Sequence, residues 1–299
     1  MKRAGVSHPS ARIASSVSEQ EFTGPVRRLH RAVIRTANSV SHPMTPWRRS
    51  LSGAYAHVLY GLSGGRGLDA EINGDIYRVD PRFRWRLWPE YEADIAAVLR
   101  ARVRPGFCCM DIGANIGIYV LQMARWSAPD GRVIAFEPNP KTFEVLKRHV
   151  RMNDLGARVT LVPMAAGRET GRAKLYDVEA GSGLSRLNNA NPAIPGAVEA
   201  TDVQLTTIDE YCGRFGVRPD LILVDVEGFE FDVLAGAVET IRRARPQVFV
   251  ELHPHMYPDG EASRAAGARL IADLGLRPVP VADSRRDPWA VGCVSLEPV

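Results

Sequence analysis

Two acidic residues follow two short apolar runs in the middle of the chain, at a spacing that suits a ribose-bearing ligand. The first run, residues 107–110, ends at Asp111, and Gly113 and Gly117 follow it. The second run, residues 133–136 of a predicted strand over residues 132–136, ends at Glu137. An acid at the tip of a second parallel strand can accept hydrogen bonds from both hydroxyls of a ribose. This spacing predicts a ribose-bearing cofactor at the carboxyl ends of parallel strands.

The turn between the first strand and the next helix decides which cofactor is expected. Residues 107–126 change from a short apolar run to helical spacing across a Gly-rich turn, which predicts a strand–turn–helix unit. A dinucleotide turn has glycine at its first, third and sixth places, where this chain has Gly113, Asn115 and Ile118. A pyrophosphate would meet side chains there. The acid Asp111 suits an ammonium group instead, and the backbone N–H groups of the loop suit a carboxylate.

Strands and helices alternate from residue 88 to the C-terminus, which predicts an α/β domain on a mostly parallel sheet. The predicted strands are residues 107–111, 132–137, 159–164, 221–226, 247–252, 277–282 and 290–296. The predicted helices are residues 90–102, 118–126, 140–152 (after an N-cap at Asn139) and 261–274. An insertion at residues 167–211 holds two candidate edge strands, 174–178 and 203–206, and we expect it to form a lid.

The N-terminal part is predicted to be a separate extension. Residues 1–22 have no periodicity and are expected to be a disordered or loosely docked basic arm. Residues 23–87 are expected to cap the substrate or to join two copies in a homodimer. Within them we predict helices at 25–40 and 51–62 and a hairpin at 70–85 that turns at Asn73–Gly74.

The charge distribution argues against a nucleic-acid partner. The chain of 299 residues has a net charge of +4, and residues 1–50, with nine Lys and Arg and two Glu, contribute +7. The remaining residues therefore carry −3, and we predict no basic face on the folded body. No metal-ligand spacing of cysteines, no signal-peptide pattern and no apolar run near the ~20 residues that cross a bilayer is present. We therefore expect a cytoplasmic protein without an integral membrane segment.

The order of these motifs resembles the FkbM-type S-adenosylmethionine (AdoMet)-dependent methyltransferases. The resemblance covers roughly residues 88–254 and rests on DIGANIG (111–117), GRVIAFEPNP (131–140), VTLVPMAAG (159–167), TTID (206–209), DLILVDVEGFEFDVLAGA (220–237) and PQVFVELHP (246–254). It implies a Rossmann-like sheet with a reversed last strand and AdoMet as the cofactor. The implied reaction is methylation of a hydroxyl on a sugar, a polyketide or another secondary metabolite.

The resemblance also assigns residues to the cofactor. It places a loop around the amino-acid part of AdoMet, one acid on the ribose, and small residues along the adenosine and the sulfonium. These are Asp111, Gly113, Ala114, Asn115 and Gly117 in the loop, Glu137 on the ribose, Pro138, Asn139, Ala165 and Ala166 along the adenosine, and Asp225 near the sulfonium. The chain departs from the pattern at Leu223, where many relatives carry a lysine.

Methyl transfer to a hydroxyl requires alignment with the sulfonium and removal of a proton. His253, Asp225 and Glu227 follow predicted strands and are the candidates for the base. Glu227, together with Glu251 and His255, is a candidate for substrate binding. The same acids and His253 are also potential metal donors, but their spacing demands no metal and we predict none.

Two further readings remain open at this point. A nicotinamide-dependent oxidoreductase or epimerase would share the sheet, although Asn115 and Ile118 disfavour it. A catalytically silent binding protein would keep the cofactor fold without turnover, and Leu223 is the feature that supports this reading. Measured binding of AdoMet and of NAD would distinguish the oxidoreductase from the methyltransferase. Measured turnover would distinguish the silent binding protein from the methyltransferase.

Overall fold

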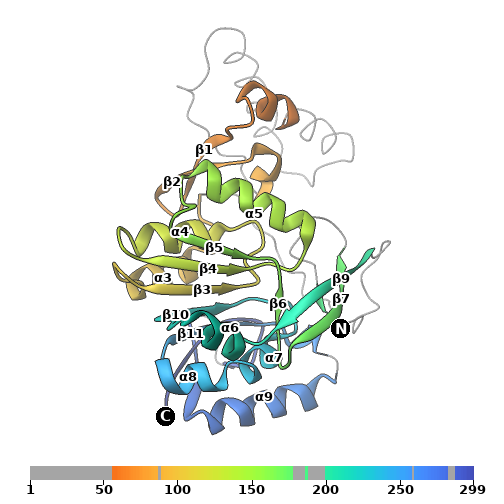
Figure 1. The fold of residues 1–299 in the computed structure, drawn as a ribbon. Helices are drawn as coiled ribbons and strands as arrows, with labels where there is room; N and C mark the ends of the chain where they lie inside the picture. Colours follow the sequence, from red (N-terminus) through yellow and green to blue (C-terminus); the bar gives the residue numbers. More distant parts are fainter. Residues whose placement is uncertain (1–55, 87–88, 178–185, 188–198, 258, 282–286) are drawn as a thin grey trace, which may run out of the picture. The chain divides into compact units, whose positions relative to one another are not determined.

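A computed structural model describes residues 56–86, 89–177, 186–187, 199–257, 259–281 and 287–299 (Figure 1). The chain divides into two compact units, residues 1–91 and 92–299, and each is described by itself. The predictions for residues 1–22 and 25–40 lie outside the described residues. The roles expected for residues 23–87 stay predictions.

The described part of the first unit is a helical segment followed by a hairpin. Residues 56–62 are helical, and β1 (Leu68–Ile72) pairs antiparallel with β2 (Asp75–Val79). The two residues between them, Asn73 and Gly74, have φ of 51° and 80°, as a tight hairpin turn requires. This confirms the predicted turn.

The hairpin is shorter than predicted. Residues Pro81–Arg86 form a 3-10 helix, η2, and not the continuation of the second strand to residue 85. Pro81 has no N–H to donate to a ladder, and the carboxylate of Asp80 accepts a hydrogen bond from the backbone N–H of Arg82 at 3.0 Å. The turn that this carboxylate stabilises ends the strand.

The second unit is built on a seven-stranded sheet, which confirms the predicted fold class. Its strand order is β12-β13-β11-β10-β3-β4-β5, and the pairs among β11, β10, β3, β4 and β5 are parallel. The last strand runs antiparallel between β11 and β12, as the resemblance implied. The strands are β3 (Cys108–Ile112), β4 (Arg132–Phe136), β5 (Val159–Val162), β10 (Leu221–Val224), β11 (Gln247–Leu252), β12 (Leu276–Pro280) and β13 (Gly292–Pro298).

Helices lie on this sheet in two groups (Figure 1). Helices α3 to α5 lie beside β3–β5, while α6 to α8 lie beside β10 and β11 and α9 contacts β12. The α5 helix begins where predicted because Pro140 occupies its first turn and the Asn139 side chain accepts from two backbone N–H groups. The first helix of the unit begins at Ala93 and not at residue 90, since Glu92 is left-handed with φ 41°. The helices are α3 (Ala93–Arg102), α4 (Ile118–Trp126), α5 (Pro140–Met152), α6 (Ile208–Phe215), α7 (Glu230–Ala235), α8 (Val238–Ala244) and α9 (Glu261–Asp273).

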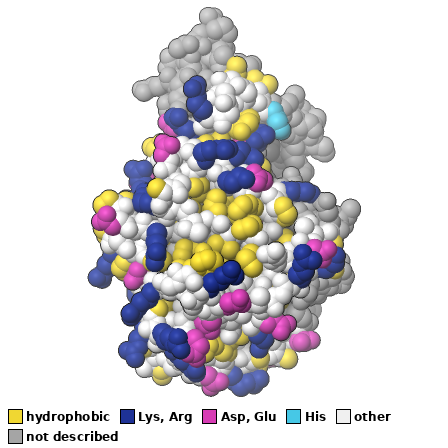
Figure 2. All heavy atoms as spheres, in the orientation of Figure 1, with side chains coloured by type: hydrophobic (Ala, Val, Ile, Leu, Met, Phe, Trp, Pro, Cys, Tyr) yellow, Lys and Arg dark blue, Asp and Glu magenta, His cyan; other side chains and the backbone are white. Residues whose placement is uncertain are grey.

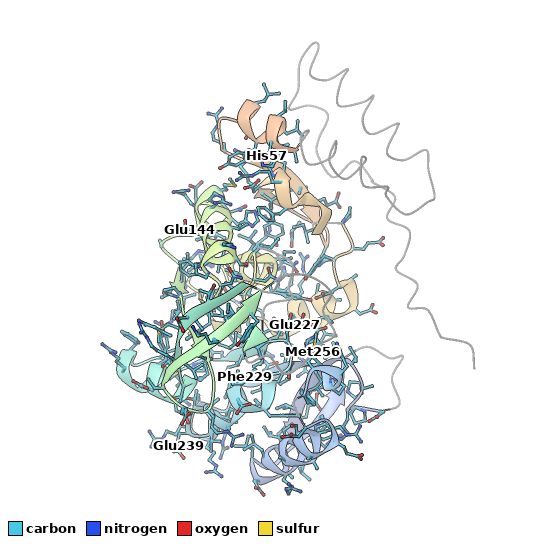
Figure 3. The ribbon with its side chains drawn as sticks, turned by 90° about the vertical axis from the view of Figure 1, so that its right-hand side faces the viewer. His57, Glu144, Glu227, Phe229, Glu239 and Met256 are labelled. Carbon is cyan, nitrogen blue, oxygen red and sulfur yellow. The ribbon has the colours of Figure 1, made fainter. Side chains whose placement is uncertain are left out.

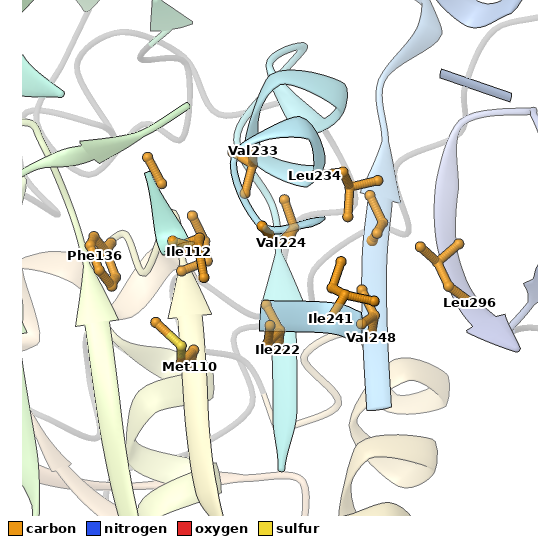
Figure 4. Packing of buried hydrophobic residues seen from close by; sticks show 14 of the residues in the cluster. Met110, Ile112, Phe136, Ile222, Val224, Val233, Leu234, Ile241, Val248 and Leu296 are labelled. Carbon is orange, nitrogen blue, oxygen red and sulfur yellow. The ribbon is translucent and has the colours of Figure 1, made fainter. Parts of the chain in front are cut away.

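The core of this unit explains why its central strands read as continuous apolar runs. Every residue of β3 and of β10 is buried, as expected for central parallel strands covered on both faces. Side chains from the two helices α7 and α8 pack on the strand side chains of one face (Figure 4). The packed residues include Met110, Ile112, Phe136, Ile222, Val224, Val233, Leu234, Ile241, Val248 and Leu296.

The described part of the insertion is a second sheet and not a structureless loop. Strand β7 (Gly171–Asp177) pairs antiparallel with β9 (Glu199–Thr206), and they lie to one side of the larger sheet (Figure 1). Two short strands complete it, β6 (Ala165–Ala166) beside β9 and β8 (Arg186–Leu187) beside β7. The insertion also ends earlier than residue 211, because α6 begins at Ile208 and its side chains enter the main core. The lid role stays a prediction.

Charged side chains of both signs are interspersed on the described face shown in Figure 2. Among the described residues, no helix combines the length and the apolar character needed to cross a membrane.

Candidate cofactor and active site

The pocket of interest lies where the carboxyl ends of the central strands meet. In the parallel registers, Ile112 at the end of β3 pairs with Phe136 of β4 and with Val224 of β10, so the three following loops start at one level. Small and apolar residues of the second sheet close another side. The lining residues are Ile112, Gly113, Asn115, Phe136, Glu137, Pro138, Thr142, Met164, Ala165, Ala166, Leu175, Asp225, Val226 and Glu227.

Close packing within the protein requires glycine at two positions of the loop after β3. Gly113 and Gly117 have φ of 91° and 93°. A Cβ on Gly113 would lie 1.8 Å from the carbonyl oxygen of Asp225, and one on Gly117 would lie 2.5 Å from Leu146 Cδ1. These two glycines therefore let the loop after β3 pack on the loop after β10 and on α5.

The first backbone N–H groups of this loop already have acceptors. Those of Gly113 and Ala114 donate to the carbonyl of Phe136 at 3.0 and 2.8 Å. That of Asn115 donates to Glu137 Oε2 at 2.9 Å, and that of Gly117 donates to the carbonyl of Ala114. These four N–H groups are therefore paired within the protein, and the expectation that loop N–H groups hold a ligand carboxylate stays a prediction.

Glu137 connects the loops after β3 and β4. Its Oε2 accepts from Asn115 N–H, and its Oε1 accepts from Asn139 N–H at 2.8 Å. A carboxylate has about four acceptor sites, so each oxygen can accept one more hydrogen bond, and Glu137 lines the pocket. Burial raises the pKa of Glu137 to about 7, although both hydrogen bonds act in the opposite direction.

Asp111 is buried behind this pocket and is not one of its lining residues. Its Oδ2 has no hydrogen-bond partner among the residues that the structure describes. Burial raises the pKa of Asp111 to about 7, and the neighbouring charge of Glu137 adds to the effect. In the β3–β10 register, Leu223 lies directly opposite Asp111. Leu223, the position at which the resemblance implied a lysine, therefore lies beside this carboxyl and supplies no charge.

The candidate catalytic residues meet at the ends of β10 and β11. Nε2 of His253 lies 3.5 Å from Glu227 Oε2, and 4.0 Å from both Asp225 Oδ1 and Glu251 Oε1. Glu227 has φ 53°, a left-handed backbone that a non-glycine residue seldom adopts. Glu227 lies near Met256 and Phe229 in Figure 3. The structure thus brings four sequence-predicted residues together, while His255 is exposed with its ring 6.1 Å from that of His253.

One residue of this cluster was absent from the sequence prediction. Glu230, in the first turn of α7, is fully buried, and its Oε1 lies 2.7 Å from Nδ1 of His253. A sequence signal existed, because Glu230 follows Glu227 by three residues within VEGFEF. An acid in the first turn of a helix is common, however, and it does not by itself predict burial.

Comparison with known proteins identifies the second unit. Residues 111–275 match the methyltransferase FkbM domain. The chain belongs to the FkbM methyltransferase family.

Three curated relatives show the range of similarity within this family. "Methyltransferase 1" of Beauveria bassiana is 29% identical over 200 residues, which cover 60% of this chain and 75% of the relative. The hexuronic acid methyltransferase AglP of Haloferax volcanii is 26% identical over 215 residues, covering 69% and 82%. The 31-O-demethyl-FK506 methyltransferase FkbM of Streptomyces tacrolimicus is 27% identical over 175 residues, covering 50% and 67%.

The FkbM family assignment makes this chain an AdoMet-dependent methyltransferase, and the pocket fits that cofactor. The lining residues include Glu137, Asp225 and Glu227 and no Lys or Arg, which suits a ligand with a sulfonium and an ammonium. Phe136, Leu175 and other apolar side chains offer a wall for an adenine ring. A pyrophosphate would instead face carboxylates, which disfavours a nicotinamide cofactor.

The charges around His253 determine its protonation. Burial alone would lower its pKa, but the hydrogen bond to Glu230 and the charges of Glu227 and Asp225 outweigh burial and raise the pKa to about 10. Burial raises the pKa of Asp225 well above its ordinary value, and the carboxylates of Glu251 and Glu227 raise it further. Because 36% of the Asp225 side chain is exposed, we attribute its raised pKa more to these neighbouring carboxylates than to burial. At neutral pH the cluster therefore contains an imidazolium.

One donor atom each from Asp225, Glu227 and His253 lies within 4.8 Å of the other two, a separation at which three side chains could share a metal ion. Ligation through Nε2 would require His253 to lose its proton, and the contact of Nδ1 with Glu230 is compatible with either state. Without a metal ion, the imidazolium supplies the positive charge at this position. That the enzyme uses no metal stays a prediction.

Proposed function

We propose that this FkbM-family protein transfers the methyl group of AdoMet to a hydroxyl oxygen of a small molecule such as a sugar, a polyketide or another secondary metabolite. Among its relatives, the names of the 31-O-demethyl-FK506 methyltransferase and of the 2-O-methyltransferase NoeI of Sinorhizobium fredii specify oxygen. The support from the chain itself is the pair formed by Glu227 and His253, because a hydroxyl must lose a proton when it is methylated.

AdoMet, when bound, supplies a methyl group on a sulfonium that a nucleophile can attack in line. The residues of this chain contribute binding, alignment and proton removal. We assign the ribose hydroxyls to Glu137, which lines the pocket, and the ammonium to the charged form of Asp111, which is buried behind the loop. Apolar side chains line part of the pocket, and alignment of the acceptor oxygen with the sulfonium lowers the barrier to methyl transfer.

Glu227 is the residue that we assign as the proton acceptor. It lines the pocket, its side chain is 25% exposed, and its partner His253 is 3.5 Å away. The imidazolium of His253 lies 3.5 Å from the Glu227 carboxyl and favours its charged form, which is the form that can accept the hydroxyl proton. His253 itself is protonated below a pKa of about 10 and cannot take that proton at neutral pH. Of the three candidates for the base, this argument favours Glu227 over His253 and Asp225.

A turnover assay tests the proposal. The full-length protein is incubated with AdoMet that carries a labelled methyl group and with a panel of hydroxylated compounds, and mass spectrometry locates the methyl group in the product. We expect a methyl ether from at least one acceptor class, with equal turnover in the presence of a chelator. Glu227→Gln is the matched inactive variant, and Glu239→Gln, on α8 and away from Glu227 in Figure 3, is the active control.

Three results would contradict the proposal in distinguishable ways. A methylated amine or carbon as the sole product would show that the acceptor atom is nitrogen or carbon and not oxygen. AdoMet binding without turnover of any acceptor would favour the silent cofactor-fold protein. Activity abolished by the chelator and restored by Mg²⁺ would show that a metal ion contributes.

A further inference from the structure

A single buried carboxylate links the two loops that carry the proton-accepting pair. Glu230 is 0% exposed. Its Oε1 accepts a hydrogen bond from the backbone N–H of Gly228 at 2.9 Å and lies 2.7 Å from Nδ1 of His253. Gly228 follows Glu227 in the loop after β10, while His253 directly follows β11. Oε1 of Glu230 therefore contacts both the loop after β10 and the segment after β11.

We propose that Glu230 is the positioning residue of this active site, because its hydrogen bond to Nδ1 fixes the His253 ring with Nε2 directed at Glu227. The part of this inference that concerns catalysis rests on the proposed function. The part that concerns the ring orientation and its charge does not.

The geometry leaves His253 one orientation that satisfies both ring nitrogens. With Nδ1–H donated to Glu230, Nε2 faces the carboxylates of Glu227, Asp225 and Glu251 at 3.5 to 4.0 Å. A base whose partner is oriented by a third, buried acid is a recurring arrangement in enzymes. The side chain of His253 is only 9% exposed, so water does not compete effectively for Nδ1.

The loop after β10 is packed so closely that the Glu230 side chain has little conformational freedom. Gly228 has φ 101°, and a Cβ there would lie 2.6 Å from Cβ of Met256, in the segment after His253. The loop after β10 therefore contacts the chain that follows His253. A change in the Glu230 hydrogen bonds would therefore move the two loops relative to each other and alter the distance between Glu227 and His253.

The charge of Glu230 also affects the protonation of His253. The titratable groups that surround this imidazole come from the loop after β10, from α7, from β11 and from the segment after it. They are Asp225, Glu227, Glu230, Glu251, His255 and Tyr257. Of these, Glu230 forms the shortest contact and is the most deeply buried acid. Replacing its carboxylate by an amide keeps an oxygen that can accept the same hydrogen bonds but removes the negative charge.

The first test measures the ring directly and needs no acceptor substrate. In the full-length protein with isotope-labelled histidines, NMR titration follows the ring nitrogens, and His253→Asn identifies its signals among seven histidines. In the wild type we expect Nδ1 to remain protonated and hydrogen-bonded. In Glu230→Gln we expect the pKa of His253 to fall by about 1 to 3, the range caused by one nearby charge.

A matched control comes from the same helix. Asp232→Asn removes one negative charge from α7 at a residue that faces Arg168 on the surface, and we expect the pKa of His253 to stay unchanged. An unprotonated Nδ1 in the wild type, or an unchanged pKa in Glu230→Gln, would overturn the proposal. The wild-type spectrum answers the first question even if the variant fails to fold.

The second test uses the acceptor found by the turnover assay. We expect Glu230→Gln to lower kcat at least about tenfold, with the KM for AdoMet within about threefold. Because the imidazolium is lost at a lower pH without the negative charge of Glu230, the alkaline fall in activity should also move to lower pH. A lower kcat with an unmoved alkaline limb would mean that Glu230 has a structural role only, and the proposal would be wrong.

Discussion

Oε2 of Glu227 and Nε2 of His253 lie 3.5 Å apart, although the two residues belong to loops that follow different strands. If Glu227 accepts the proton of the acceptor hydroxyl, Glu227→Gln should lower kcat about 100-fold, the usual contribution of a general base. AdoMet affinity should fall less than about tenfold, because the carboxamide keeps the size of the side chain and only one of the three acids lining the pocket loses its charge. Single-turnover kinetics and calorimetry with AdoMet measure the two quantities. Equal loss of kcat in Glu239→Gln would point to a general effect of charge and contradict the assignment.

AdoMet binding should weaken as the pH falls below 7. The pKa values of Asp111 and Glu137 are both raised to about 7, so each carboxyl loses its charge between pH 7 and 5.5. The ammonium of AdoMet keeps its charge in that window. We expect affinity measured by calorimetry to fall more than about tenfold over it. Glu137→Gln should bind weakly at both pH values and show a flatter dependence. Constant wild-type affinity would show that neither carboxylate binds the cofactor in its charged form.

The same burial should make cofactor-free protein less stable at alkaline pH. A carboxyl whose folded pKa is raised stabilises the fold while it is protonated, and this contribution is lost as the pH rises from about 4 to about 7. Asp111→Asn removes the cost of ionisation. We expect it to raise the free energy of unfolding at pH 8 by about 1 to 3 kcal/mol, with a smaller gain at pH 6, while AdoMet binding is lost. Thermal unfolding without AdoMet measures this, and lower stability than wild type at both pH values would contradict it.

Leu223 explains why the charge of Asp111 has no protein partner on β10. Because Leu223 lies opposite Asp111 in the parallel register, Leu223→Lys would place an ammonium beside that carboxyl. We expect the pKa of Asp111 to fall by about 1 to 3, and the acid loss of AdoMet affinity should move to lower pH by a similar amount. Leu223→Met, with a similar volume and no charge, is the control. An unshifted pH dependence in a folded Leu223→Lys variant would show that the added charge points away from Asp111.

Much of the sheet could be predicted from the sequence because local and tertiary signals agree there. Helix α5 begins after an Asn cap and a proline, and its predicted bounds match the structure. Asp111 and Glu137 each end an apolar run, so the parallel register alone brings them to one edge. The four-stranded sheet was harder to predict, since β7 ends at Asp177 and its partner β9 begins only at Glu199.

Glu230 shows what a sequence pattern cannot predict. Its role depends on a contact with His253, 23 residues later in the chain, and on burial that surrounding residues create. Its neighbours Phe231, Val233 and Leu234 indicate a short buried helix, in which an acid at the first turn is ordinary. The three-dimensional structure was needed to distinguish a buried carboxylate with a partner from a solvated one.

The contact between Gly113 and Asp225 should make the first loop intolerant of any side chain. An alanine at Gly113 would adopt φ near 91° with its Cβ 1.8 Å from the Asp225 carbonyl oxygen, so the backbone after β10 would have to move. We expect Gly113→Ala to destabilise the protein by at least about 2 kcal/mol and to abolish AdoMet binding, because Asp225 is displaced from the pocket. Gly213→Ala is the matched control, as it lies in α6 with open space around it and should be neutral or stabilise by about 0.5–1 kcal/mol. Thermal unfolding and calorimetry measure both effects, and a Gly113→Ala variant with wild-type stability would show that the two loops do not pack as closely as described.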